Sequence, residues 1–383
     1  MKSSPVTDYQ IIILGAGAAG LMAAAFLPRR RVLVIDHNEG PGRKIAISGG
    51  GRCNVTNAEV TPAYYLGDAA FIEQVFSRFD HHDLLAFLRS GGCQPVLRKG
   101  SQYFCPESAR QLIDFFQKRT VHADFAYGTE IVSVKKRGER FVVDTSAGRF
   151  EAPTLLVTTG GLSYASVGAS GIGFFIAERF GHTVVPPRPA LVGLTLQRGE
   201  AWMKRLSGLS FLVEVSVGRR KMAGDMLFAH RGLSGPVILD ASLFWNSRKL
   251  TVDFLPGIRL RRLFKNPKKS AITQIPLPKR FVHAFFEALG LPNIPYHAMD
   301  NAQKQNLSTL KSYAFAPAGT FGYAKAEATK GGVCTDEIDP STMQSRLIPG
   351  LHFAGEVIDV TGRLGGYNFQ WAFSSAVVAA KSV

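Results

Sequence analysis

The chain has 383 residues, of which 46% are hydrophobic and 19% charged, so it is long enough for two or three domains and too apolar to be largely disordered. Its four cysteines form no CxxC pair and no dense framework, which argues against structural disulfides and against a zinc site. The net charge of +16 is concentrated in residues 190–333, which hold 21 Lys and Arg against 8 Asp and Glu. Such a surface attracts nucleic acid, phosphorylated substrates or anionic membranes.

The N-terminus, MKSSPVTDYQ, lacks a basic leader followed by an apolar core and a small-residue cleavage site. Reduced cysteines and the missing leader together predict a cytoplasmic protein. The apolar run at residues 11–27 approaches the length of a short membrane span, but its glycines have the spacing of a nucleotide-binding loop. We therefore expect no membrane contact.

Residues 10–36 predict a strand, a glycine turn, a helix of small residues and a second strand. The turn reads GAGAAG, in which glycines permit a tight turn, the approach of a pyrophosphate and close packing of helix on strand. An acid ends the second strand at the distance expected for a carboxylate that binds a ribose. The predicted dinucleotide contacts here are Gly15, Gly17, Ala18, Ala19, Gly20, Asp36 and His37.

Further elements follow in order. Residues 71–92 place Phe and Leu at three- and four-residue spacing and predict a helical region of the core. Residues 130–159 alternate as short strands of a small antiparallel sheet. The proline-rich stretch 186–196 marks a domain boundary, beyond which strand-like segments such as 211–217 precede a basic, helical stretch. An inserted β domain carrying a smaller helical piece is therefore expected.

The dinucleotide is NAD or FAD, and two later segments favour FAD. Residues 154–161 form an apolar strand that ends in a glycine pair, and residues 350–368 form a strand, an acid, a glycine-rich loop and the start of a helix. In FAD proteins such additions bracket the cofactor, and the helix N-terminus faces the flavin edge that becomes negative on reduction. The predicted contacts are Gly160, Gly161, Gly355, Glu356, Gly365, Gly366, Tyr367 and Asn368.

Six ordered motifs carry a resemblance to a known family. They read GAGAAGLMAA, GRKIAISGGGRCNVTN, TTGGLSYASVGAS, FAHRGLSGPVIL, ATKGGV and GLHFAGEVIDVTGRLGGYNFQWAFSSA. Together they resemble the bacterial YhiN and BaiN-like family of FAD-binding flavoproteins across essentially the whole chain.

The resemblance implies an α/β fold in which a glutathione-reductase-like, Rossmann-type FAD domain is interrupted by a β-barrel-like domain and a small helical domain. We expect the FAD domain at residues 1–189 and 334–383. The β-barrel-like domain would cover 190–258 and 319–333, and the basic helical domain 259–318.

Members of this family act on different substrates. The resemblance implies a dihydrouridine synthase of large-subunit ribosomal RNA for the YhiN type, a bile-acid reductase for the BaiN type, and an aminoacetone oxidase for others. This sequence is most similar to the YhiN type. It departs from a widespread family form in having Ile172, instead of an acid, between Gly171 and Gly173, so a cofactor role for that acid does not transfer.

The stretch 42–57, GRKIAISGGGRCNVTN, looks like a linker, but its position in the family pattern predicts a flavin-facing loop. Two cations would neutralise the pyrophosphate, and glycine backbone would lie against the ring. The predicted contacts are Arg43, Lys44, Ser48, Gly49, Gly50, Gly51, Arg52, Cys53 and Asn54.

Dihydrouridine formation needs a hydride from the reduced flavin N5 to uracil C6 and a proton at C5, so a general acid is expected. Cys105 is the first candidate, because the resemblance places a cysteine there in YhiN-type sequences, and Cys53 is its rival. That neither is essential stays open. The resemblance implies that His230 and Arg231 lie on a turn facing the flavin cleft, where either would orient a base or phosphate, and His230 is a third catalytic candidate. A solvent-exposed turn without such a role stays open.

Three basic clusters predict an RNA-facing surface. Phe264 and Phe281 between them could stack on bases, but burial of both rings in the core is favoured. The predicted RNA contacts are Arg219, Arg220, Lys221, Arg259, Arg261, Arg262, Lys265, Lys268, Lys269, Lys279 and Arg280. Three functions remain open: a ribosomal RNA uridine reductase, a reductase or oxidase of a small molecule, and a flavoprotein that only binds RNA. NADPH or NADH is expected as a transient electron donor, a metal is not, and a monomer is favoured.

Overall fold

We describe a computed structural model of the protein, covering residues 7–98 and 100–383. The chain forms two compact units: the first comprises Met1–Pro189 and Glu327–Val383, and the second Ala190–Ala326. The boundary after residue 189 lies where the proline-rich stretch predicted it. Residues 327–333, which the sequence placed in the inserted domain, belong to the first unit instead, because β21 (Ala328–Val333) pairs with β13 (Val184–Ala190).

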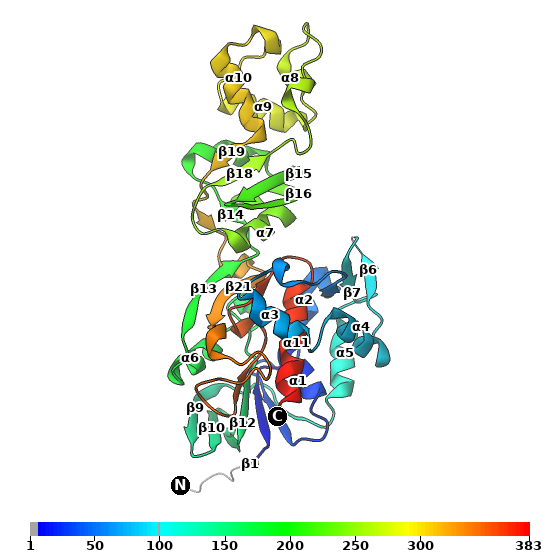
Figure 1. Ribbon diagram of the computed structural model, residues 1–383, viewed down its shortest axis with the longest axis vertical. Coiled ribbons are helices and arrows are strands. Elements are labelled where there is room, and N and C mark those ends of the chain that lie inside the picture. Colours follow the sequence, from blue (N-terminus) through cyan, green and yellow to red (C-terminus); the bar gives the residue numbers. More distant parts are fainter. Residues whose placement is uncertain (1–6, 99) are drawn as a thin grey trace. The chain divides into compact units, whose positions relative to one another are not determined.

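A five-stranded parallel sheet forms the centre of the first unit (Figure 1). Its order is β22-β12-β2-β3-β8, and every neighbouring pair runs parallel. The inner strands β12, β2 and β3 consist almost entirely of Val, Ile and Leu and are buried, as expected for a sheet covered on both faces, whereas the edge strand β8 is exposed to half-buried. The strands are β2 (Ile11–Leu14), β3 (Val32–Ile35), β8 (Asp124–Ala126), β12 (Thr154–Val157) and β22 (Leu351–Phe353).

Two helices pack against each other beside this sheet: α1 (Ala18–Ala25) and α11 (Tyr367–Lys381). α11 is buried along almost its whole length, so it is a core helix and not an amphipathic surface helix. The predicted Rossmann-type βαβ start and C-terminal return of the chain are thereby confirmed.

The remaining elements surround this centre. A four-stranded sheet of order β1-β11-β10-β9 occupies the predicted antiparallel region. The single helical region predicted at 71–92 is two helices, α3 (Ala69–Phe76) and α4 (His81–Ser90), because the Asp80 side chain caps a new helix start. The other elements are β1 (Thr7–Asp8), β4 (Asn54–Asn57), β5 (Tyr65–Leu66), β6 (Val96–Arg98), β7 (Gln102–Phe104), α5 (Arg110–Arg119), β9 (Ile131–Arg137), β10 (Arg140–Thr145), β11 (Gly148–Ala152), α6 (Ile172–Arg179) and β23 (Thr361–Gly362).

The second unit is built on a seven-stranded antiparallel sheet of order β19-β18-β15-β16-β17-β14-β20. Its edge strands β19 (Tyr313–Phe315) and β20 (Gly319–Thr320) are joined by three residues. That connection spans at most about 14 Å, whereas the edges of a flat seven-stranded sheet would lie about 29 Å apart. The sheet is therefore strongly curled, in agreement with the barrel-like domain expected. The inner strands are β14 (Leu194–Thr195), β15 (Ser210–Val217), β16 (Arg220–Ala229), β17 (Gly232–Ser234) and β18 (Leu250–Asp253).

Four helices complete this unit: α7 (Pro236–Phe244), α8 (Ala271–Gln274), α9 (Lys279–Ala288) and α10 (Asn301–Ser308). The helices α8 to α10 share one hydrophobic core with the sheet, in which Phe228, Phe254, Phe281 and Phe285 are fully buried. Among the residues the structure describes, no helix combines the length and the apolar character needed to cross a membrane.

Candidate dinucleotide site

The glycine turn after β2 has two packing positions and one open position. A Cβ at Gly20 would lie 1.8 Å from the Gly15 carbonyl oxygen, and one at Gly15, where φ is +106°, would lie 2.8 Å from the Thr158 carbonyl oxygen. These two glycines therefore allow the turn, helix α1 and the end of β12 to approach one another. A Cβ at Gly17 would meet nothing within 4 Å. Its backbone is thus open to a ligand at the carboxyl ends of the strands, where open α/β sheets bind ligands.

Asp36 directly follows β3 and is held at this turn by hydrogen bonds. Its carboxylate accepts hydrogen bonds from the Ala16 N–H at 2.6 Å, the Asn38 N–H at 2.8 Å and the Asn38 side-chain amide at 2.9 Å. A carboxylate offers about four acceptor positions, so at least one remains for a hydroxyl donor. The side chain of the neighbouring His37 faces Gly168, where an added Cβ would lie 2.6 Å from its Nε2.

The stretch 42–57 begins as a helix, which corrects the predicted loop. α2 (Arg43–Gly51) is regular only as far as Ile47, since Ser48 is extended and Gly49 to Gly51 have φ of 57°, 67° and 81°. Left-handed backbone at three successive residues requires glycine. The linker interpretation is wrong, because the Cys53 N–H donates to Ser48 O at 3.0 Å and the Ala109 N–H to Gly51 O at 2.7 Å. Cβ atoms at Gly50 and Gly51 would meet nothing within 4 Å, so this backbone is also open.

Buried hydrogen bonds hold the N-terminus of α11 against β4. The Thr56 hydroxyl donates to the Gln370 side-chain oxygen at 2.6 Å, and both residues have an exposed fraction of 0%. The Asn57 side chain donates to the Gly365 carbonyl at 3.0 Å. Gly366 caps α11 without a side-chain hydrogen bond to the first turn, so that turn presents backbone N–H groups and the positive end of the helix dipole. The sequence did not identify Thr56 or Gln370, whose roles appear only when β4 and α11 meet.

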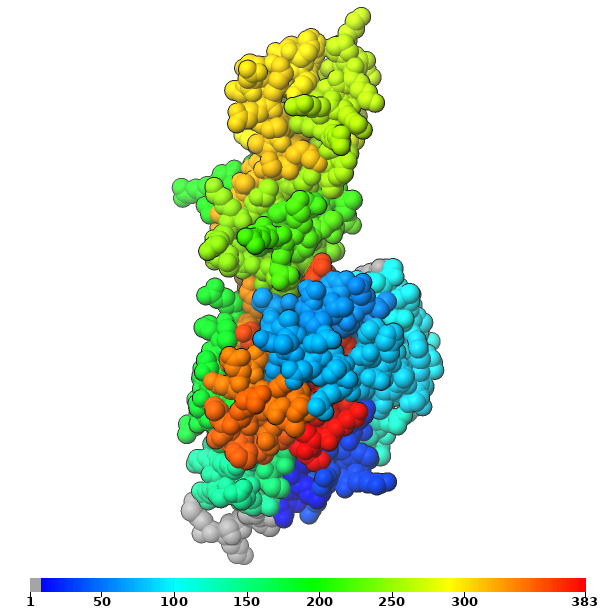
Figure 2. Space-filling model, in the orientation of Figure 1, coloured from blue at the N-terminus to red at the C-terminus, as the bar shows by residue number. Residues whose placement is uncertain are grey.

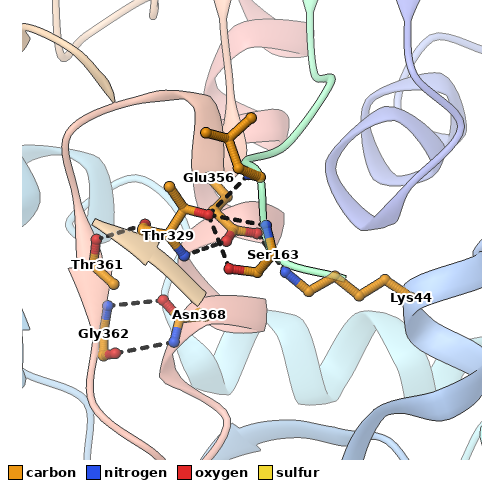
Figure 3. A network of polar contacts seen from close by, with 8 residues as sticks. Lys44, Ser163, Thr329, Glu356, Thr361, Gly362 and Asn368 are labelled. Carbon is orange, nitrogen blue, oxygen red and sulfur yellow. Dashed lines mark hydrogen bonds and ion pairs between the residues drawn. The ribbon is translucent and has the colours of Figure 1, made fainter. Parts of the chain in front are cut away.

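Two of the predicted α11 contacts hold the loop itself. The Asn368 side chain accepts from the Gly362 N–H at 2.8 Å and donates to the Gly362 carbonyl at 3.0 Å (Figure 3). Tyr367 is 7% exposed and stacks on Tyr64, with ring centroids 5.0 Å apart. Both side chains therefore shape the glycine-rich loop before α11.

An ion pair joins α2 to the end of β22. The Lys44 ammonium lies 2.8 Å from a Glu356 carboxylate oxygen, and the other oxygen accepts from the Thr329 N–H at 2.7 Å (Figure 3). The Thr329 hydroxyl in turn accepts from the Leu162 and Ser163 N–H groups at 2.8 and 3.1 Å. The Lys44 charge is therefore already paired with a carboxylate of the protein. Arg43 is exposed and forms no ion pair with any residue the structure describes.

The carboxyl end of β12 contains a buried polar atom without a partner. The Thr159 hydroxyl is inaccessible to solvent and forms no hydrogen bond. It precedes Gly160, which has φ of +73° and nothing within 4 Å of an added Cβ, whereas a Cβ at Gly161 would lie 2.6 Å from the Thr329 hydroxyl. The Thr159 hydroxyl faces Gly173 of α6, where an added Cβ would lie 2.0 Å from it, so this hydroxyl belongs to the packing of α6. The open backbone at Gly17, Gly50 and Gly160 and the start of α11 fit an extended, phosphate-bearing dinucleotide such as FAD.

The cysteines predicted as proton donors are buried together. Cys53 and Cys105 have exposed fractions of 0%, and Cys93 of 4%. The hydrogen bond with Cys53, and also burial, raise the pKa of Cys105 to about 12, and the hydrogen bond with Cys105 raises that of Cys93. Both of these thiols are therefore protonated at neutral pH. Neither Cys53 nor Cys105 is exposed to solvent, and the role of either thiol as proton donor stays a prediction.

Arg52 and Asn54, the two polar side chains predicted to contact the flavin, differ in exposure. Arg52 is exposed, and Asn54 is half-buried. Oriented to satisfy both of its side-chain atoms, the Asn54 amide donates to the Tyr103 and Thr56 carbonyls and accepts from the Gly366 N–H at 3.1 Å. Asn54 therefore connects the glycine triplet to the start of α11.

The remaining predicted residues lie in the second unit. His230 and Arg231 form an exposed turn between β16 and β17, with the Arg231 guanidinium 5.4 Å from the centroid of the Phe321 ring. The eleven predicted RNA contacts are all exposed, but Arg280 donates to the Arg205 and Ser207 carbonyls. The expectation that Phe281 is buried in the core is confirmed, since its exposed fraction is 0%, and base stacking by this ring is thereby excluded.

Comparison with known proteins identifies the family. Residues 9–382 match the family described as the HI0933-like protein Rossmann domain. The chain belongs to this family. It is 37% identical over 398 residues to the Escherichia coli protein named ribosomal RNA dihydrouridine synthase, covering 98% of this chain and 99% of that protein.

Two further relatives differ in name and in sequence identity to this chain. The Haemophilus influenzae protein of the same name is 36% identical over 391 residues, covering 97% of this chain and 98% of that protein. The Clostridium scindens protein named 3-dehydro-bile acid delta(4,6)-reductase is 29% identical over 405 residues, covering 97% of this chain and 98% of that protein. The resemblance found in the sequence motifs is thereby confirmed at the level of the family.

Proposed function

We propose that the protein is an FAD-dependent oxidoreductase that reduces a uridine of large-subunit ribosomal RNA to dihydrouridine. The observation that carries the proposal is the open glycine backbone at Gly17, Gly50 and Gly51, around a sheet edge that fits a dinucleotide. Two family relatives at 36% and 37% identity are named ribosomal RNA dihydrouridine synthases, and these names are the basis for proposing ribosomal RNA as the substrate.

The first unit would hold FAD in an extended form. Asp36 has acceptor capacity for the ribose, the glycine turn before α1 receives the pyrophosphate, and Arg43 neutralises part of its charge. Gly49 to Gly51 and the start of α11 would line the flavin, and the positive end of α11 favours the negative charge of the reduced ring. Bound and reduced by NADPH or NADH, the flavin supplies the hydride for uracil C6. The Thr56–Gln370 and Lys44–Glu356 contacts fix the elements around it.

The charge of the second unit favours RNA over a small apolar substrate. Residues 190–326 hold 20 Lys and Arg against 7 Asp and Glu. A bile-acid-like enone, the kind of substrate named for the relative at 29% identity, requires no such surface. A polyanion gains affinity from it by counterion release.

Nucleoside analysis of a deletion strain tests this function. Ribosomal RNA from the deletion strain is expected to lose one dihydrouridine, and expression of the wild-type gene is expected to restore it. Unchanged dihydrouridine content would overturn the proposal. If the purified protein still bound RNA and FAD in that case, it would be a flavoprotein that binds RNA without modifying it.

A further inference from the structure

Residues 259–318 of the second unit carry a strong positive charge, of which the described residues neutralise only Lys311, through an ion pair with Asp253 at 2.6 Å. They hold ten Lys and Arg and only two acids. Of the acids, Glu287 pairs with Arg205 at 3.0 Å, and Asp300 caps α10 by accepting from the Gln303 N–H at 2.8 Å. Five exposed cations within nine residues form no ion pair with any described residue: Arg261, Arg262, Lys265, Lys268 and Lys269.

The loop that carries three of these cations is held in a defined shape. The Gln274 side chain accepts from the Asn266 N–H at 3.1 Å and donates to the Asn266 and Lys269 carbonyls at 3.2 and 3.0 Å. The Asn266 side chain accepts from the Lys268 N–H at 3.0 Å. The loop is therefore preorganised, which lowers the entropy lost when its lysines bind a partner. In Figure 2 the yellow-green segment that includes it lies at the surface of the second unit.

An aromatic pair lies within this basic segment. Phe264 and Tyr296 stack with ring centroids 4.3 Å apart and planes inclined by 5°, and both side chains are half-buried. The Lys304 ammonium lies 5.6 Å from the centroid of the Tyr296 ring. The pairing of residues 270–271 with 294–295 brings the two rings together, through the Ala271 N–H donating to Ile294 O at 2.9 Å.

We propose that the preorganised lysine loop and the Phe264–Tyr296 pair form a binding site for unpaired RNA. Phe264 and Tyr296 pack partly against the hydrophobic core of the second unit and remain partly exposed. Lysines and arginines neutralise phosphates of any RNA, whereas aromatic rings stack on bases that are free to leave a helical stack. The site rests on the proposed function for the identity of the polyanion. It anchors the substrate RNA through the second unit, separately from the flavin contacts of the first unit.

The test measures binding of two fluorescein-labelled RNAs, an oligouridylate of about 20 nucleotides and a duplex of the same length. The variant Phe264→Leu/Tyr296→Leu keeps apolar volume but removes the rings. It is expected to weaken oligouridylate binding about tenfold and to leave duplex binding unchanged. Phe264→Tyr/Tyr296→Phe is expected to retain full affinity. Phe125→Leu, which removes one ring of the stacked Phe125–Tyr127 pair in the first unit, is the matched control and is expected to change neither.

Charge and loop shape are tested in the same assay. Lys268→Gln/Lys269→Gln is expected to weaken the binding of both RNAs. For the oligouridylate, the slope of the logarithm of the binding constant against the logarithm of the salt concentration is expected to become shallower by about 1.4. Gln274→Leu removes the hydrogen bonds that hold the loop but removes no charge, so it is expected to weaken the binding of both RNAs without changing that slope.

The aromatic site would be overturned if Phe264→Leu/Tyr296→Leu lost affinity equally for the oligouridylate and the duplex. It would also be overturned if this variant kept the wild-type affinity for both RNAs and the circular dichroism spectrum of the folded protein. Binding to anionic phospholipid vesicles in place of RNA would overturn the choice of partner. The outcome is distinguishable from failure of the proposed function, because binding is measured without any reduction of uridine.

Discussion

The two glycines at the start of α1 predict opposite effects of the same substitution. Gly17 has φ of −80°, ψ of −164° and open space around an added Cβ, so Gly17→Ala introduces neither strain nor a clash into the protein. Alanine lowers the entropy of the unfolded chain, which stabilises the fold, but it caps the helix less well than glycine, which destabilises it. The two effects nearly cancel, so the free energy of unfolding is expected to change by less than about 1 kcal/mol. The methyl group stands where the pyrophosphate approaches, so FAD affinity should fall at least about tenfold.

Gly20→Ala is the contrasting variant. Its Cβ would lie 1.8 Å from the Gly15 carbonyl oxygen, far inside van der Waals contact, and backbone has to move to accommodate it. Overpacking of this kind costs about 1–3 kcal/mol or more. Gly20→Ala is therefore expected to lose both stability and FAD binding.

The assay measures both quantities on flavin-free protein. Denaturant unfolding gives the free energy of unfolding, and titration with FAD, followed by flavin fluorescence, gives the dissociation constant. A stable Gly17→Ala protein with wild-type FAD affinity would refute the placement of the dinucleotide at this turn.

Three further predictions concern the thiols, the cations and pH. Cys105→Ala is expected to cost about 1 kcal/mol of stability and to leave dihydrouridine formation within a few-fold of wild type; a loss of about a hundredfold would identify a direct proton donor instead. Arg43→Met is expected to weaken FAD binding more than Lys44→Met, because Lys44 is already paired with Glu356; equal losses in a fluorescence titration would contradict this. Burial lowers the pKa of His352 from 6.5 to about 4, so its imidazole is neutral in the fold and the unfolded chain takes up a proton first as pH falls below 6.5. Between about pH 7.5 and 5.5 this group should remove about 1.4 kcal/mol of stability, and denaturant unfolding of His352→Gln should show a pH dependence smaller by that amount.

Local pattern was sufficient for the βαβ unit and for the glycine turn. Period-two and continuous apolar runs identify β2 and β3, and the spacing of Gly15, Gly17 and Gly20 depends on contacts within a few residues. The break between α3 and α4 was missed, although Asp80 and Asp83 form a capping box that the sequence displays.

Contacts between residues far apart in the chain could not be predicted from the sequence pattern. Thr56 meets Gln370 across 314 residues, and Thr329 meets Glu356 through the pairing of distant segments. The burial of Cys105 beside Cys53 follows from packing that no local pattern encodes, and Phe281 has the same apolar character whether it faces solvent or core. Residue type suggested the chemistry of these positions, but tertiary packing decides whether a ligand reaches them.

The most direct test supplies the purified protein with FAD, reduces the flavin chemically, and adds ribosomal RNA from the deletion strain. We expect one dihydrouridine to form per large-subunit RNA in the wild-type reaction, and much less with Gly17→Ala at FAD concentrations that saturate only the wild type. Formation of no dihydrouridine by a protein that has bound both reduced FAD and the RNA would contradict the proposed function.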